Sequence, residues 1–83
     1  MRFRVTWFDI NDGMPNSICG CPIVLCIRRT TRREFVDVTE EEITVNGSDY
    51  RLPANAQRFI RKFDDGHPVK PFSFNIPGIK KAK

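Results

Sequence analysis

The stretch from Arg58 to Ile76 constrains the fold most, because its hydrophobic period changes at a glycine. Large apolar residues first recur at the spacing of one helical face and then alternate as in a half-buried strand. Gly66 separates the two patterns at the position where a helix stop is expected, and Pro68 follows just beyond it. The pattern therefore predicts a helix over residues 54–65, a stop at Gly66 and a strand over residues 72–76.

The first residues of the chain alternate strictly between apolar and polar side chains. This period predicts a strand over residues 2–7 with one buried face. The buried face consists of Phe3, Val5 and Trp7. Residues 9–13 then indicate a short helical turn that is capped by Asp9 and stopped by Gly13.

A second helix is predicted over residues 22–32. Pro22 suits the first helical position, because its fixed backbone angle is compatible with a helix start and its missing N–H has no partner there. Residues 23–27 are apolar nearly all round and are expected to be buried. Residues 28–33 are mostly arginine, and cations near the C-terminal end of a helix interact favourably with its dipole.

Asn46-Gly47 lies between two short segments with strand-like patterns, and this dipeptide favours a two-residue hairpin turn. Counting back from the turn pairs Val45 with Ser48, Ile43 with Tyr50, and Glu42 with Arg51. In this register the apolar residues share one face, while the opposite charges pair on the other. A further short strand is predicted over residues 35–38, where β-branched and aromatic residues are frequent.

Together these elements predict a single α+β domain with the order β-α-β-β-β-α-β. We expect a mostly antiparallel sheet with two helices on one face. The other face is expected to be solvated and carries Arg2, Arg4, Ser73 and Asn75. The domain spans residues 1–79, and the basic residues 80–83 are expected to form a disordered tail.

The charge and the cysteine content limit which partners and which cellular compartment are expected. The 83 residues include 14 Lys and Arg against 10 Asp and Glu, which gives a net charge of +4. This balance favours an anionic partner such as a nucleic acid, a nucleotide or an acidic protein surface. The three cysteines do not suggest a disulfide framework, and neither a secretory signal nor a membrane-spanning run is visible, so we expect a reducing cytoplasm.

The basic residues of the two longer helices are the main candidate binding site. They are Arg28, Arg29, Arg32 and Arg33 in the first helix, and Arg58, Arg61 and Lys62 in the second. If the helices lie side by side, these residues form one surface suited to phosphates or carboxylates. Readout of single-stranded nucleic acid also requires exposed aromatic residues, and most aromatic residues here are expected in the core.

The entry to the first long helix is a second candidate site. Free N–H groups at a helix start can receive an anion, and the residues concerned are Cys19, Gly20, Cys21 and Ile23. A thiolate is also favoured at such a position. The alternative is a small zinc module that adds Cys26 and His67, but the spacing fits the usual ligand pairs poorly, so no metal or other cofactor is expected. No motif of a phosphate loop or nucleophile elbow is present, and we expect a protein that is not an enzyme.

Four segments resemble small proteins carried by tailed bacteriophages and prophages. They are Cys-Pro-Ile-Val-Leu (21–25), Tyr-Arg-Leu-Pro (50–53), Phe-Ile-Arg-Lys-Phe-Asp-Asp-Gly (59–66) and Val-Lys-Pro-Phe-Ser-Phe (69–74). The likeness extends from about Asp9 to Ile76. It implies a phage-encoded protein that is made in the host bacterial cytoplasm, and it assigns no role to any individual residue.

These observations lead to one expected function and three alternatives. We expect a phage accessory protein that acts by binding, and that inhibits a host or defence protein with an acidic surface through its basic helical face. The alternatives are a nucleic-acid-binding protein, a sponge for a signalling nucleotide, which is expected to be oligomeric, and the zinc module. The sequence does not specify the oligomeric state.

Overall fold

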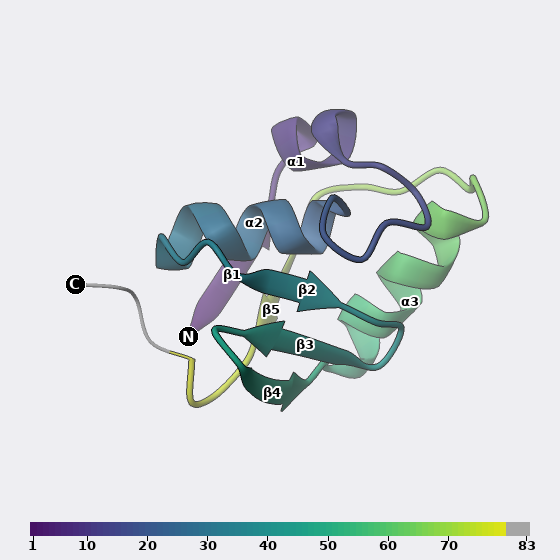
Figure 1. Ribbon diagram of the computed structural model, residues 1–83. Helices are drawn as coiled ribbons and strands as arrows, with labels where there is room; N and C mark the ends of the chain where they lie inside the picture. The colour runs from purple at the N-terminus through teal and green to yellow at the C-terminus, as the bar shows by residue number, and fades with distance from the viewer. Residues whose placement is uncertain (80–83) are drawn as a thin grey trace.

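The computed structural model describes residues 1–79, and the tail predicted at residues 80–83 lies outside this range (Figure 1). The elements are β1 (Arg2–Val5), α1 (Trp7–Asp12), α2 (Pro22–Thr31), β2 (Val36–Val38), β3 (Glu42–Val45), β4 (Ser48–Arg51), α3 (Ala54–Asp64) and β5 (Phe72–Asn75). This order confirms the predicted α+β class, with α1 as the short helical turn before the first long helix.

The strands form two antiparallel sheets rather than the one that was expected. The first contains β1 and β5, which join the two ends of the described chain, and the second contains β2, β3 and β4 in sequence order. In the first sheet Arg4 lies opposite Ser73, and the Arg4 Nη1 donates to the Ser73 Oγ at 3.3 Å. Arg2, Arg4 and Asn75 are exposed, as predicted for this face, and Ser73 is half-buried.

The hairpin of β3 and β4 has the register that was predicted from its turn. Val45 lies opposite Ser48, and Ile43 lies opposite Tyr50. Gly47 has a φ of 85°, in the left-handed region that a two-residue hairpin turn requires. The turn and the hydrophobic pattern therefore select the same register.

The two long helices also begin and end close to their predicted bounds. Pro22 opens α2, and Arg32 ends it in the left-handed conformation, with a φ of 60°. At the end of α3, the Gly66 N–H donates to the Phe63 carbonyl and the His67 N–H donates to the Lys62 carbonyl. These two hydrogen bonds form a Schellman motif, so Gly66 is the predicted helix stop.

A row of phenylalanine rings connects α3 with the first sheet. Successive ring centroids are 6.0 Å apart for Phe63 and Phe59, 4.8 Å for Phe59 and Phe72, 5.6 Å for Phe72 and Phe74, and 5.3 Å for Phe74 and Phe3. Such offset stacking stabilises the fold beyond the contribution from burying each ring. The predicted apolar face of α3 and the apolar face of β5 therefore pack against each other.

The first helix begins earlier than predicted, and this changes the position of Trp7. Thr6, not Asp9, is the N-cap, and Asp9 completes a capping box by accepting a hydrogen bond from the Thr6 N–H. Trp7 is therefore the first residue of α1 and is 56% exposed, not the last buried residue of a strand. Phe35 is also exposed and precedes β2 rather than opening it.

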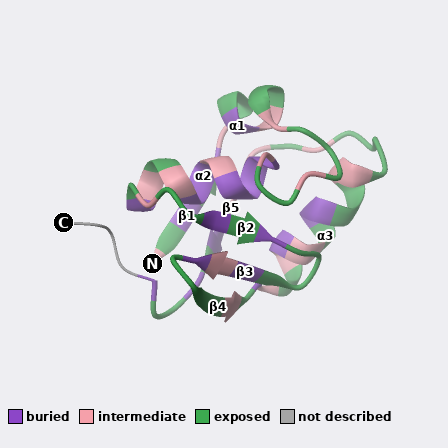
Figure 2. Ribbon diagram, in the orientation of Figure 1, coloured by how far each residue is buried: buried purple, intermediate pink, exposed green. Residues whose placement is uncertain are grey.

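The buried residues line the inward sides of α2, α3 and β1, whereas α1 and the segment between α3 and β5 are mainly exposed (Figure 2). α2 packs on β1, β2 and α1. No helix within residues 1–79 is long and apolar enough to cross a membrane.

Candidate functional site

A groove runs between α3 and the chain segment that returns to β5. It encloses a volume of about 470 Å³, and we call it the α3 groove. The residues on which its chemistry depends are Arg58, Phe59, Lys62, Val69, Lys70 and Phe72. A second hollow of about 580 Å³ shares Arg58 and Lys62 and extends the groove towards Arg61 and His67.

Helical geometry places the cations of this groove on one side. Arg58 and Lys62 are four residues apart on α3, so their side chains lie one above the other on the same face. Ile60 points to the opposite side, and Phe59 lies between the two sides at the base of the groove; both are buried. The reversal at Gly66 then brings Lys70 back beside α3, so that residues from two segments line one groove.

The cations of the groove are not paired with carboxylates of residues 1–79, although Asp65 lines the adjoining hollow. Arg58, Arg61, Lys62 and Lys70 are all exposed. Within residues 1–79, none of these four side chains forms an ion pair with a carboxylate. Like charges on neighbouring turns of a helix repel one another, and a bound anion relieves that repulsion. The groove therefore favours an anionic ligand.

The floor of the groove is apolar. Phe59 is 6% exposed, while Val69 and Phe72 are half-buried and close the space between the helix and the returning segment. Phe59 and Phe72 also stack on each other, so their ring faces are largely occupied. The groove can therefore receive an apolar side chain together with negative charges, but it offers little free aromatic surface on which a base could stack.

The arginines of α2 do not extend this groove. α2 packs on β1, β2 and α1 rather than along α3, and Figure 1 shows its C-terminal end directed away from α3. Arg28, Arg32 and Arg33 line a separate shallow hollow with Glu34. The side-by-side arrangement on which a single basic surface depended is therefore not present.

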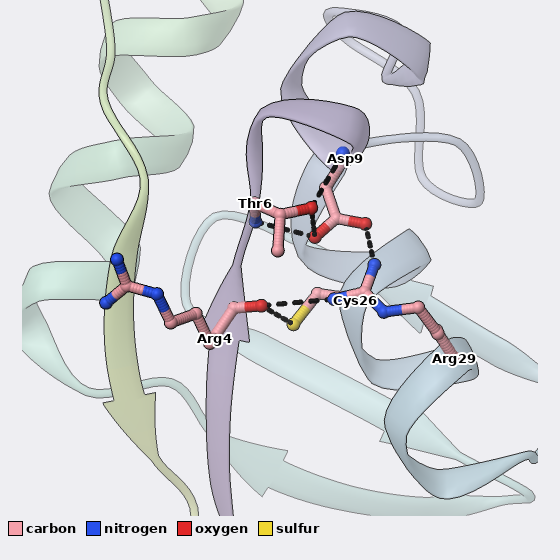
Figure 3. Close-up of polar contacts among 5 residues, drawn as sticks. All are labelled: Arg4, Thr6, Asp9, Cys26 and Arg29. Carbon is pink, nitrogen blue, oxygen red and sulfur yellow. Dashed lines mark hydrogen bonds and ion pairs between the residues drawn. The ribbon is translucent and has the colours of Figure 1, made fainter.

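Arg29 is held within the fold. Its Nη1 pairs with the Oδ1 of Asp9, and its Nη2 donates to the Arg4 carbonyl at 3.1 Å (Figure 3). The hydrogen bond to Asp9 raises the pKa of the Arg29 guanidinium further, so the group stays charged. Asp9 is only 3% exposed and also accepts hydrogen bonds from Thr6. Arg29 therefore joins α2 to α1 and β1, and its guanidinium is engaged within the fold rather than directed to a shared basic surface.

The entry to α2 is closed to an anion. The Gly20 N–H donates to the Ser17 Oγ at 2.9 Å, and both Cys21 and Ile23 are buried. Burial raises the pKa of the Cys21 thiol, and the nearby Asp64 carboxylate raises it further, against the opposing effect of the Ile23 and Val24 N–H groups. The raised pKa favours the protonated thiol near neutral pH, so Cys21 suits a structural role at this helix start rather than nucleophilic or redox chemistry.

The three cysteines differ in their exposure to solvent. Cys19 is exposed, whereas Cys26 is buried and its thiol donates to the Arg4 carbonyl at 3.2 Å. Burial raises the pKa of the Cys26 thiol to about 11. In the part of the chain that the structure describes, no three His, Cys, Asp or Glu side chains lie close enough together to hold a metal ion.

Some residues of the groove were not predicted as a site from the sequence. Lys70 was visible as a cation and Phe72 as a core residue, but nothing in their local pattern placed them beside Arg58. The available signal was the helix stop at Gly66, because a chain that reverses there can run back alongside α3.

The chain matches no model of a known protein family, and it shows no detectable similarity to a curated protein or to a solved structure. The resemblance to phage proteins therefore stays a prediction from the sequence.

Proposed function

We propose that this protein acts by binding an acidic segment of another protein in the α3 groove, and that it thereby inhibits a host or defence factor. The observation that supports this most directly is the convergence of Arg58, Lys62 and Lys70 over an apolar floor, with no carboxylate of residues 1–79 paired to any of them. The phage setting and the host cytoplasm rest on the sequence resemblance.

An acidic protein segment suits the groove better than the other anionic ligands. Carboxylates can pair with the three cations while a neighbouring apolar side chain contacts Val69 and Phe72. A single-stranded nucleic acid needs open aromatic faces, and the two rings of the floor stack on each other instead. A nucleotide at the α2 entry is disfavoured because the Gly20 N–H is already bonded there.

Two charge-reversal variants with equal net charge test the proposal. Arg58→Glu with Lys62→Glu alters the groove, and Arg28→Glu with Arg32→Glu alters the separate arginines of α2. The tagged proteins are used to capture partners from a nuclease-treated bacterial lysate, and each captured protein is then purified for binding measurements. We expect the groove variant to bind at least about tenfold more weakly, and the α2 variant to bind like the unmodified protein.

Two outcomes would contradict this function. One is loss of binding in the α2 variant with retention in the groove variant, which would move the contact surface to Arg28 and Arg32. The other is capture of a partner only from lysate without nuclease treatment, with binding that weakens steeply with added salt, because that behaviour indicates a nucleic acid whose counterions are released on binding.

A further inference from the structure

Other parts of the chain occupy outward backbone groups on three of the outer strands. In β1, the Arg4 carbonyl accepts hydrogen bonds from the Cys26 thiol and from Arg29 (Figure 3). In β5, the Ser73 carbonyl accepts a hydrogen bond of 3.0 Å from the Asn55 Nδ2. Unpaired backbone groups at a sheet edge are a template for another strand, and these contacts occupy one such carbonyl in each strand of the first sheet.

The second sheet is covered at one edge only. On the outer side of β2, the Val38 N–H donates to the Ile18 carbonyl at 2.8 Å, so the loop before α2 protects this edge. β4 is the other outer strand, and Figure 1 shows no helix or strand beyond it.

The hydrogen bonds of β3 show which groups of β4 point outwards. The Glu42 carbonyl accepts from the Thr39 N–H, and the Asn46 N–H donates to the Phe35 carbonyl. The backbone groups of Glu42, in β3, and of Asn46, just after it, therefore point to β2. Because the direction of the backbone N–H and carbonyl groups alternates along a strand, those of Ile43 and Val45 point to β4.

Their partners in β4 are Tyr50 and Ser48, whose backbone groups therefore point to β3. The N–H and carbonyl groups of Asp49 and Arg51 must then point away from the sheet. No group within residues 1–79 forms a backbone hydrogen bond with either of them. The open edge of β4 thus presents two residues with free backbone groups and opposite side-chain charges.

We propose that this edge pairs with the same edge of a second copy of the chain. An antiparallel pairing about a twofold axis at Tyr50 places Asp49 opposite Arg51 of the partner subunit and Arg51 opposite Asp49 of the partner subunit. Both pairs have outward backbone groups, so each can exchange both of its N–H to carbonyl hydrogen bonds. The two three-stranded sheets then become one continuous sheet.

Charge complementarity selects a second copy as the occupant. Each cross-strand pair in this arrangement joins a carboxylate to a guanidinium, which stabilises antiparallel strands. Proline and bulges are two devices that protect an edge strand, and β4 contains neither a proline nor a residue with positive φ. In a twofold interface, a contact from residue i of one subunit to residue j of the other always occurs a second time from j to i. The two pairs of Asp49 with Arg51 have this symmetry.

Four proteins test the pairing by sedimentation velocity over concentrations from about 10 µM to 1 mM, which covers micromolar to millimolar dissociation constants. We expect the unmodified chain to form a reversible dimer. Asp49→Arg places two arginines opposite each other and Arg51→Asp places two aspartates opposite each other, so each variant should associate at least about tenfold more weakly. The double variant with both changes restores the opposite charges and should dimerise again.

A mixture of the two single variants is the most specific arm of the experiment. An equimolar mixture of Asp49→Arg and Arg51→Asp should form a heterodimer, since its cross-strand charges are again opposite. A monomer at every concentration for the unmodified chain, or undiminished association in both single variants, would overturn the proposal.

Amide hydrogen exchange of the unmodified chain provides a second measurement that needs no variant to fold. Protection of the Asp49 and Arg51 amides should increase with protein concentration, while that of Tyr50 should not. Concentration-independent exchange at Asp49 and Arg51 would also overturn the proposal. For the sedimentation experiment, circular dichroism checks that each variant remains folded.

Discussion

Arg29 of α2 pairs with the buried Asp9 of α1, and the same guanidinium donates to the Arg4 carbonyl at 3.1 Å. One side chain thus contacts two elements that precede its own helix. The contacts on Asp9 are completed by Thr6, whose N–H donates to the Asp9 Oδ2 at 2.8 Å. A residue of an arginine-rich segment is therefore part of the structural framework.

Replacing Arg29 with alanine should destabilise the fold. Removal of the guanidinium leaves the Asp9 carboxylate buried without its charge partner, and such a loss is costly. Because the Arg29 side chain is 49% exposed, water already screens the pair, and we expect a decrease of about 1–3 kcal/mol in the free energy of unfolding. Urea denaturation measures the change. Arg32→Ala is the control, and equal losses in the two variants would contradict the assigned role.

Replacing Arg32 with glycine should stabilise the fold. Arg32 ends α2 with a φ of 60°, a conformation that costs a residue with a Cβ atom but costs glycine little. We expect an increase of about 0.5–1 kcal/mol in the free energy of unfolding. Arg32→Ala retains the Cβ and should give no such increase. A glycine variant that is no more stable than the alanine variant would contradict the assigned cost of the left-handed conformation at residue 32.

The buried Cys26 thiol should make stability fall at high pH. Burial raises its pKa from 9.0 to about 11 in the folded chain. Between these values the unfolded chain loses the proton and the folded chain keeps it, so the unfolded state binds fewer protons and is favoured as pH rises. The loss from this group is about 2–3 kcal/mol between pH 9 and pH 11. The raised pKa of Cys21 acts in the same direction.

Cys26→Ser provides the matched comparison for this pH dependence. A serine hydroxyl retains a donor for the Arg4 carbonyl but does not titrate in this range. Its stability should therefore decline less steeply from pH 9 to pH 11 than that of the unmodified chain, whatever the difference in absolute stability. Parallel declines in urea denaturation series would show that Cys26 does not titrate on unfolding as described.

The features that depend on neighbouring residues were predictable from the sequence. Asn46-Gly47 determines its own turn, so the pairing of Ile43 with Tyr50 follows by counting. Gly66 likewise ends α3 through local hydrogen bonds. The capping box at Thr6 was also visible, as a threonine followed three residues later by aspartate, but the alternation through Trp7 favoured a longer strand.

The features that depend on distant residues were not predictable in this way. Nothing near β1 specifies that its partner is β5 rather than a strand of the hairpin, and this choice divides the strands into two sheets. The pairing of Arg29 with Asp9 and the position of Lys70 beside Arg58 also follow from packing between separate segments. Side-chain charge alone does not distinguish an arginine that binds a partner from one that joins two helices.

An NMR titration tests the central claim, binding in the α3 groove, most directly. The probe is a short peptide in which aspartates and glutamates flank a leucine, and the control peptide has lysines in place of the acidic residues. We predict saturable amide shifts in α3 and residues 67–72 with the acidic peptide only, lost in the variant with Arg58→Glu and Lys62→Glu and retained in the variant with Arg28→Glu and Arg32→Glu. Shifts centred on Arg28 and Arg32, or no saturable shift in α3, would contradict the claim.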